Sequence, residues 1–146
     1  MEKYVDNRRP ILLVEDNPLD VDLTKRAFKK RNFLNPIKVA RDGEEALAYI
    51  EKWENGELLP LIVLLDLKLP KVDGLEVLSK LKAHDRLRVI PVVVLTSSSE
   101  DKDVQTAYKY GANSYIVKPV DFDKFLQVAS DIEIYWLATT TLPRQE

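Results

Sequence analysis

The sequence has 146 residues and a formal net charge of −2, which suits one domain with a sizeable core and gives no basic field for nucleic acid. It contains no cysteine and a single histidine, so disulfides, thiolate metal ligation and histidine-rich metal sites are excluded. The charged first residues lack the apolar core of a signal peptide, and no apolar run approaches the ~20 residues that span a bilayer. These features predict a cytoplasmic protein without a membrane partner.

The first half of the chain alternates short apolar runs with amphipathic segments. Residues 11–14 are predicted to form a buried strand that ends at an acidic pair. Asn17 and Pro18 supply the N-cap and first-turn proline of a helix that runs to about residue 31. A second strand is expected at residues 37–40. The Asp-Gly-Glu-Glu sequence at 42–45 then has the spacing of a capping box and begins a second helix.

The same alternation continues to the end of the chain. Strands are predicted at residues 61–65, 92–95 and 114–117. Helices follow from Gly74, from Glu100 to a C-terminal Gly111, and from a capping Asp121 to about Leu137. Five strand–helix units predict an α/β, doubly wound fold with a five-stranded parallel sheet. We expect one domain over 1–146 with its core at about 10–138 and loosely held ends at 1–9 and 139–146.

Polar residues follow four of the five predicted strands. They are Glu15 and Asp16 after the first strand, Asp66 after the third, Thr96 after the fourth and Lys118 after the fifth. Because parallel strands end at one edge of the sheet, these side chains should converge there. Clustered carboxylates repel one another and need a cation to stay ionised. Oxygen ligands without histidine or cysteine favour Mg²⁺.

A carboxylate surrounded by Mg²⁺, a lysine and a hydroxyl is typical of phosphoryl transfer, where positioning and charge neutralisation carry most of the catalysis. In this interpretation Asp66 is the nucleophile and forms an aspartyl phosphate. The added charge of about −1.5 to −2 would be offset by the metal and by Lys118.

Four motifs in the expected order resemble the receiver domain of two-component response regulators. They lie at residues 13–17 (Leu-Val-Glu-Asp-Asn), 64–74 (Leu-Leu-Asp-Leu-Lys-Leu-Pro-Lys-Val-Asp-Gly), 94–98 (Val-Leu-Thr-Ser-Ser) and 111–119 (Gly-Ala-Asn-Ser-Tyr-Ile-Val-Lys-Pro). The resemblance extends from about Ile11 to Leu137. It implies the flavodoxin-like strand order 2-1-3-4-5, for which a member of this family is a well-known example.

The resemblance also implies a role for each matching residue of the site. Asp66 matches the phosphoacceptor, and Lys118 matches the lysine that pairs with the phosphoryl group. Asp16 matches the direct Mg²⁺ ligand, with Glu15 acting through water and the backbone carbonyl of Lys68 as a further ligand.

Two positions match the family's switch. Thr96 matches the hydroxyl that binds the phosphoryl group, and Tyr115 matches the aromatic residue that turns inward when the threonine moves. The family implies a cis peptide bond between Lys118 and Pro119. The side chains of Lys68 and Ser98 stand where the family tunes autodephosphorylation, which leaves the lifetime of the phosphate open.

A closer resemblance is to the single-domain regulators of bacterial phytochrome histidine kinases. It rests on the Leu-Val-Glu-Asp-Asn-Pro start, the long loop at 53–60, the Asp-Leu-Lys-Leu-Pro sequence at 66–70 and the Tyr-Trp pair at 135–136. Those regulators imply a homodimer on the face formed by the fourth helix, the fifth strand and the fifth helix.

The last predicted helix has more apolar residues than one core stripe requires. Its core stripe is predicted to contain Phe122, Phe125, Ala129, Ile132 and Trp136. Val128, Ile134, Tyr135 and Leu137 would widen the apolar surface beyond it. We interpret this wider surface as an oligomer contact.

The predicted function is a stand-alone response regulator that takes a phosphoryl group from a sensor histidine kinase and signals through a dimer or an unidentified downstream protein. It is not expected to be a turnover enzyme. An aspartyl-phosphate phosphatase would need a second acid where Lys68 stands, and a flavin protein would not place Glu15 and Asp16 beside a phosphate. A phosphorylation-independent interaction module, or a purely structural ion pair at Lys118, remains the alternative.

Overall fold

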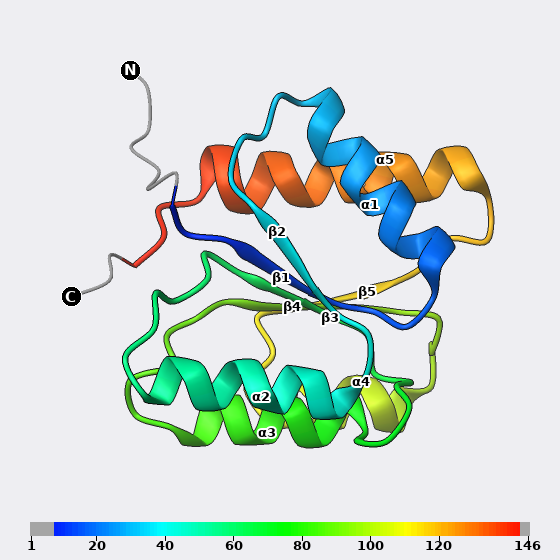
Figure 1. Cartoon of the computed structure of the whole chain (residues 1–146). Helices are drawn as coiled ribbons and strands as arrows, with labels where there is room; N and C mark the ends of the chain where they lie inside the picture. Colours follow the sequence, from blue (N-terminus) through cyan, green and yellow to red (C-terminus); the bar gives the residue numbers. More distant parts are fainter. Residues whose placement is uncertain (1–7, 144–146) are drawn as a thin grey trace.

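The computed structural model describes residues 8–143 (Figure 1). Its strands are β1 (Ile11–Val14), β2 (Ile37–Ala40), β3 (Val63–Leu65), β4 (Val92–Thr96) and β5 (Ser114–Val117). Its helices are α1 (Pro18–Lys30), α2 (Gly43–Glu54), α3 (Gly74–Ala83), α4 (Asp101–Lys109), α5 (Phe122–Ile132) and the π-helical η1 (Glu133–Thr139). None of the helices in this part of the chain is long and apolar enough to cross a membrane.

The five strands form one parallel sheet in the order β2-β1-β3-β4-β5, which confirms the predicted fold and strand order. Helices α1 and α5 cover one face of the sheet, and α2, α3 and α4 cover the other (Figure 1). The order reverses between β1 and β3, where an open α/β sheet places its ligand site.

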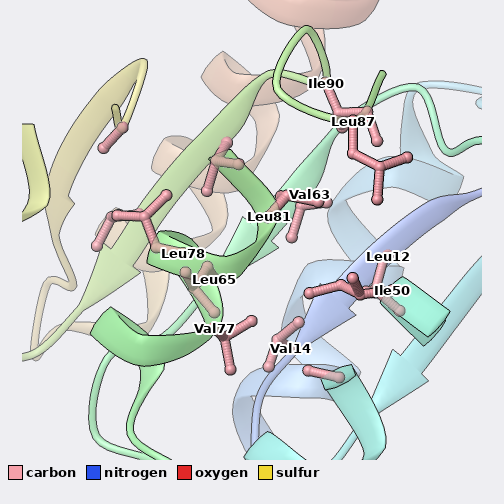
Figure 2. Packing of buried hydrophobic residues seen from close by; sticks show 14 of the residues in the cluster. Leu12, Val14, Ile50, Val63, Leu65, Val77, Leu78, Leu81, Leu87 and Ile90 are labelled. Atoms are coloured by element: carbon pink, nitrogen blue, oxygen red, sulfur yellow. The ribbon is translucent and has the colours of Figure 1, made fainter. Parts of the chain in front are cut away.

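Each face of the sheet has its own apolar core, because successive side chains of a strand point to opposite faces. Leu12 and Val14 of β1 join the core beneath α2 and α3, which Figure 2 shows with Val63, Leu78 and other buried residues. Ile11 and Leu13 join the core beneath α1 and α5. Burial on both faces explains why the strands appear in the sequence as continuous apolar runs.

The predicted N-caps at Asn17 and Asp42 are confirmed. Asn17 Oδ1 accepts a hydrogen bond from the backbone N–H of Leu19 at 2.9 Å, and Asp42 Oδ1 accepts one from Glu45 at 2.8 Å. These bonds satisfy backbone donors that the first turn of a helix leaves unpaired. They fix where α1 and α2 begin relative to the strands before them.

The third strand is shorter than predicted, because it begins at Val63 and not at Leu61. The backbone N–H of Leu61 donates to Pro10 O at 2.8 Å, ahead of β1. Residues 61 and 62 therefore make isolated backbone hydrogen bonds to β1 and the residue before it, and the regular pairing of β3 with β1 starts at Val63.

The core stripe of the last helix also differs from the prediction. After Ile132 the chain continues as a π-helix, in which hydrogen bonds span five residues and each turn takes more residues. Leu137, five residues after Ile132, is therefore buried, whereas Trp136 is only partly buried. The prediction that placed Leu137 on the exposed apolar surface was wrong. Phe122, predicted as core, is exposed at the start of α5.

Arg9 joins the two ends of the described chain. Its buried guanidinium donates to Leu59 O at 3.1 Å, to Pro60 O at 2.8 Å and to Pro143 O at 3.0 Å. Residue 9 and the segment near 143 thus have fixed partners, although both fall in stretches expected to be loosely held. Residues 1–7 and 144–146 of those stretches lie outside the described residues.

Candidate functional site

Backbone hydrogen bonds carry the sheet up to the residues that were predicted to form the site. The N–H of Asp66 donates to Val14 O at 3.0 Å, and the N–H of Lys118 donates to Thr96 O at 2.7 Å. The N–H of Glu15 donates to Ala40 O at 2.9 Å. Each residue leaves its strand at the same edge, so the predicted convergence is a direct result of the parallel register.

Three carboxylates meet at this edge. Glu15, Asp16 and Asp66 each offer one oxygen, and these oxygens all lie within 4.8 Å of one another. Glu15 and Asp66 are buried, whereas Asp16 is exposed. A purely oxygen donor set that is open to water on one side fits Mg²⁺ or another hard divalent cation, which keeps several water ligands.

Lys118 lies against this cluster. Its ammonium nitrogen is 2.5 Å from Glu15 Oε1 and 2.9 Å from Asp66 Oδ2, and only 9% of the side chain is exposed. It also lies 2.9 Å from Asp20 Oδ2 in the first turn of α1. The contact with Asp66 was expected. Asp20 was missed, because an acid in a first turn is common wherever a helix N-terminus favours negative charge.

The electrostatics of the cluster reflect burial and mutual repulsion. Burial raises the pKa of Glu15 to about 7, the charge of Asp66 adds to the rise, and the hydrogen bond from Lys118 opposes it. Burial alone would lower the pKa of Lys118, but its bonds to Glu15, Asp66 and Asp20 outweigh that effect and raise it. The lysine is therefore held as a cation, and a further cation would stabilise the ionised carboxylates.

Thr96 ends β4 at the same edge and is fully buried. Its hydroxyl oxygen lies 3.5 Å from the backbone nitrogen of Ser98, at the limit of a hydrogen bond. The hydroxyl therefore has only a weak partner in the loop between β4 and α4.

Tyr115 lies in β5 beside that loop, and its hydroxyl donates to Ser98 O at 2.8 Å. The ring is partly buried, and burial raises the pKa of its hydroxyl. The structure thus links Tyr115 to the loop that follows Thr96.

The loop after β3 holds Asp66 through its backbone. The N–H of Lys68 lies 3.3 Å from Asp66 Oδ1, and the N–H of Gly74 donates to Leu67 O at 2.9 Å. A Cβ on Gly74 would lie 2.4 Å from Asp66 O. Only glycine allows α3 to start this close to the backbone of Asp66 and Leu67.

The side chain of Lys68 points to a residue that the sequence did not single out. Its ammonium lies 3.5 Å from Asp103 Oδ2 in the first turn of α4. Asp103 also accepts a hydrogen bond from the Ser98 hydroxyl at 2.5 Å. Sequence reasoning missed this buried acid for the same reason that it missed Asp20.

The expected cis bond is not present. The peptide bond between Lys118 and Pro119 is trans, as are all peptide bonds in residues 8–143. The preference for trans before proline is only about 0.5–1 kcal/mol, so the sequence alone leaves both isomers accessible.

Curated proteins that are similar to this chain over most of its length include FilR2 and Rcp1. The probable methanogenesis regulatory protein FilR2 of Methanothrix harundinacea (strain 6Ac) is 48% identical over 134 residues, which cover 91% of this chain and 86% of FilR2. The response regulator Rcp1 of Synechocystis sp. (strain ATCC 27184 / PCC 6803 / Kazusa) is 39% identical over 136 residues, covering 91% and 92%.

Solved structures that share the fold at similar coverage include three response regulators. The phosphorylated cyanobacterial phytochrome response regulator RcpA has a TM-score of 0.88 and 38% identity, covering 94% of this chain and 99% of that one. The Mn²⁺-bound form of Rcp1 has a TM-score of 0.87 and 38% identity, with coverage of 93% and 99%. The bacteriophytochrome response regulator AtBRR has a TM-score of 0.69 and 50% identity, with coverage of 90% and 96%.

The family model of the response regulator receiver domain matches the sequence over residues 11–130, a range that includes all five strands and most of the helices. The same range contains the acidic cluster, Thr96, Tyr115 and Lys118. On its sequence, its strand order and this match, the chain belongs to the response regulator receiver domain family, with similarity to phytochrome response regulators.

Proposed function

We propose that the protein is a stand-alone response regulator whose Asp66 accepts a phosphoryl group from the phosphohistidine of a sensor histidine kinase. The observation that carries the proposal is the ammonium of Lys118, buried 2.9 Å from Asp66 Oδ2 beside Glu15 and Asp16. A nucleophile, a fixed cation and a set of metal ligands are the parts that phosphoryl transfer needs.

In the reaction, a carboxylate oxygen of Asp66 attacks phosphorus, and the bond from phosphorus to the imidazole nitrogen breaks with its electron pair leaving on that nitrogen. Lys118 is already beside the carboxylate and pairs with the phosphoryl oxygens. Glu15, Asp16, Asp66 and the carbonyl of Lys68 would hold Mg²⁺. The metal would neutralise the developing charge on the transferred group. The Mn²⁺ in the Rcp1 structure supports a divalent cation in this family.

The switch follows from the charge that the transfer adds. An aspartyl phosphate adds a charge of about −1.5 to −2 and new acceptor oxygens. The Thr96 hydroxyl, which has only a weak partner in the loop, is the donor proposed to bind one of them. Moving the loop would shift the position of the Ser98 carbonyl, to which the Tyr115 hydroxyl donates its hydrogen bond. The surface of α4 and β5 would then report the state of Asp66.

The protein is proposed to be a phosphoacceptor that dephosphorylates itself, and not a turnover enzyme. An aspartyl-phosphate phosphatase is the runner-up. The residue two positions after Asp66 is Lys68, whose side chain pairs with Asp103, so no general acid is supplied there. This contact supports the receiver role.

A phytochrome-type histidine kinase is the proposed phosphodonor. The support is the similarity to proteins named as phytochrome response regulators, at 38% to 50% identity. Phosphotransfer from such a kinase, compared with that from an unrelated histidine kinase, would test the pairing.

A homodimer is proposed on the face formed by α4, β5 and the last helix. Tyr108, Val117 and Tyr135 are exposed there. A hollow of about 450 Å³ lies between β5 and the last helix, lined by residues that include Ile116, Val128, Tyr135 and Trp136. Exposed apolar patches of this kind are typical of protein–protein contacts.

The deciding experiment is intact-mass measurement after incubation with a small phosphodonor and Mg²⁺, with Asp66→Asn as the matched control. We expect one acid-labile phosphoryl group on the wild type and none on the variant. If neither the small donor nor a cognate kinase adds mass, the phosphorylation-independent interaction module is the better account.

A further inference from the structure

Asp103 is a buried carboxylate that the proposed chemistry does not use. It lies in the first turn of α4, and only 5% of the residue is exposed. Its Oδ2 accepts the hydrogen bond from Ser98 Oγ at 2.5 Å and lies 3.5 Å from Lys68 Nζ. The hydrogen bond, and then the charge of Lys68, hold its pKa below the usual range. Asp103 is therefore a fixed anion inside the protein.

The two partners of Asp103 belong to the two loops that border the acceptor site. Lys68 is two residues after Asp66, and its backbone N–H lies 3.3 Å from Asp66 Oδ1. Ser98 is two residues after Thr96, and its carbonyl accepts the hydrogen bond from Tyr115. One carboxylate on α4 thus connects the loop after β3, the loop after β4 and the ring on β5.

We propose that Asp103 is a positioning residue that holds Lys68 and Ser98 in the arrangement of the unphosphorylated protein, and that the phosphoryl group on Asp66 competes with it for the Lys68 ammonium. This inference rests on the proposed function, since it needs an aspartyl phosphate. It adds a second connection from the site to α4 that does not pass through Thr96.

Charge and solvation both favour the phosphoryl group over Asp103 as the partner of the Lys68 ammonium. The pair of Lys68 and Asp103 is long for a salt bridge, and 60% of the lysine side chain is exposed, so water already weakens it. The phosphoryl group carries up to twice the charge of a carboxylate and forms three strong acceptor contacts. Lys68 therefore moves toward the phosphoryl group. Asp103 is then left with Ser98, and a buried carboxylate that loses a cation drives rearrangement of the turn around it.

The plain alternative is that Asp103 only stabilises the start of α4. Acids are favourable in a first turn, and the N-cap residue Glu100 makes no side-chain capping bond. In that case removing the charge lowers stability but leaves the resting position of Tyr115 unchanged. The position of Tyr115 is therefore the measurement that separates the two roles.

The test is NMR of the Tyr115 ring, assigned with Tyr115→Phe, with and without beryllium fluoride and Mg²⁺ as a mimic of the aspartyl phosphate. In the wild type, the mimic shifts the Tyr115 ring signal from its resting position. Without the mimic, we expect Asp103→Asn and Lys68→Gln, each in the full chain, to move the signal in that same direction by at least a third of the distance. The double variant should move it no further than Asp103→Asn alone, and Lys68→Arg should restore the wild-type position. Asp101→Asn, an exposed acid in the same turn, is the matched control and should change nothing.

The outcomes separate this inference from the proposed function. A wild-type spectrum that does not respond to the mimic overturns both. If the wild-type ring signal responds to the mimic but the signals of Asp103→Asn and Lys68→Gln stay at the wild-type resting position, this inference alone is overturned. Additive shifts in the double variant also overturn it. If Asp103→Asn does not fold, the exposed Lys68 side chain still provides the comparison between glutamine and arginine.

Discussion

The ammonium nitrogen of Lys118 lies 2.9 Å from Asp66 Oδ2, although the two residues are 52 positions apart in the sequence. The contact joins the ends of β3 and β5, so the fold assembles the acceptor site in advance of any ligand. It also makes the stability of the fold depend on the chemistry of the site.

Replacing Lys118 by methionine should lower the free energy of unfolding of the metal-free protein by about 3–5 kcal/mol, because buried Glu15 and Asp66 lose their cation. Urea unfolding followed by circular dichroism measures the change. Lys124→Met, an exposed lysine on α5, should stay within about 0.5 kcal/mol of the wild type. A loss at position 118 no larger than at position 124 would contradict the expected dependence.

Adding Mg²⁺ should stabilise the wild type, since a ligand that binds only the folded state shifts the unfolding equilibrium. At a concentration 100 times its Kd, the gain is about 2.7 kcal/mol. Asp16→Asn should lose most of this gain, whereas Asp22→Asn, which removes only an exposed pair with Arg26, should keep it. Thermal unfolding with and without the metal measures both. Equal gains in the two variants would count against the proposed ligand set.

Lys82 should titrate at low pH for a lysine, because burial lowers its pKa from 10.5 to about 8. The unfolded chain then binds this proton more tightly than the folded one, so the contribution of Lys82 to stability should rise as the pH increases from about 8 to 10.5. The measurement is the difference in unfolding free energy between wild type and Lys82→Met across that range. A flat difference would mean that the ammonium's bonds to Arg88 O, Ile90 O and Asn113 Oδ1 restore its ordinary pKa.

Tyr135→Ser should weaken the proposed homodimer by at least tenfold in Kd, since the exposed ring lies beside the hollow between β5 and the last helix. Leu34→Ser is the matched control, because Leu34 is the more exposed side chain but follows α1, away from that face. Light scattering over a range of concentrations reports the mass. A wild type that is monomeric throughout, or equal effects of the two changes, would argue against this face.

The strands and the converging site could be predicted because both depend on simple patterns. Continuous apolar runs mark strands that are buried on both faces, and the polar residue after each run must lie at one edge of a parallel sheet. Asp20 and Asp103 could not be found in this way. An acid in the first turn of a helix is favoured whether or not it has a partner, and only the packing of the loops shows which acids meet a lysine.

The prediction for the end of the last helix was wrong for a different reason. The predicted stripe assumed a period of 3.6 residues, and the change to a π-helix after Ile132 replaces Trp136 with Leu137 in the core. No residue in the segment signals that change.

The bonds from Arg9 to Leu59, Pro60 and Pro143 have a consequence for how the domain can be attached to other molecules. They hold the first and last described segments together where β1 begins (Figure 1). Asp66 follows the last residue of β3, at the opposite edge of the sheet. A label or a second domain fused directly at Arg8 or Pro143 therefore starts at the edge of the sheet opposite the acceptor. A kinase can then approach Asp66 without meeting the attachment, and a circular permutant that joins Pro143 directly to Arg8 needs only a short linker.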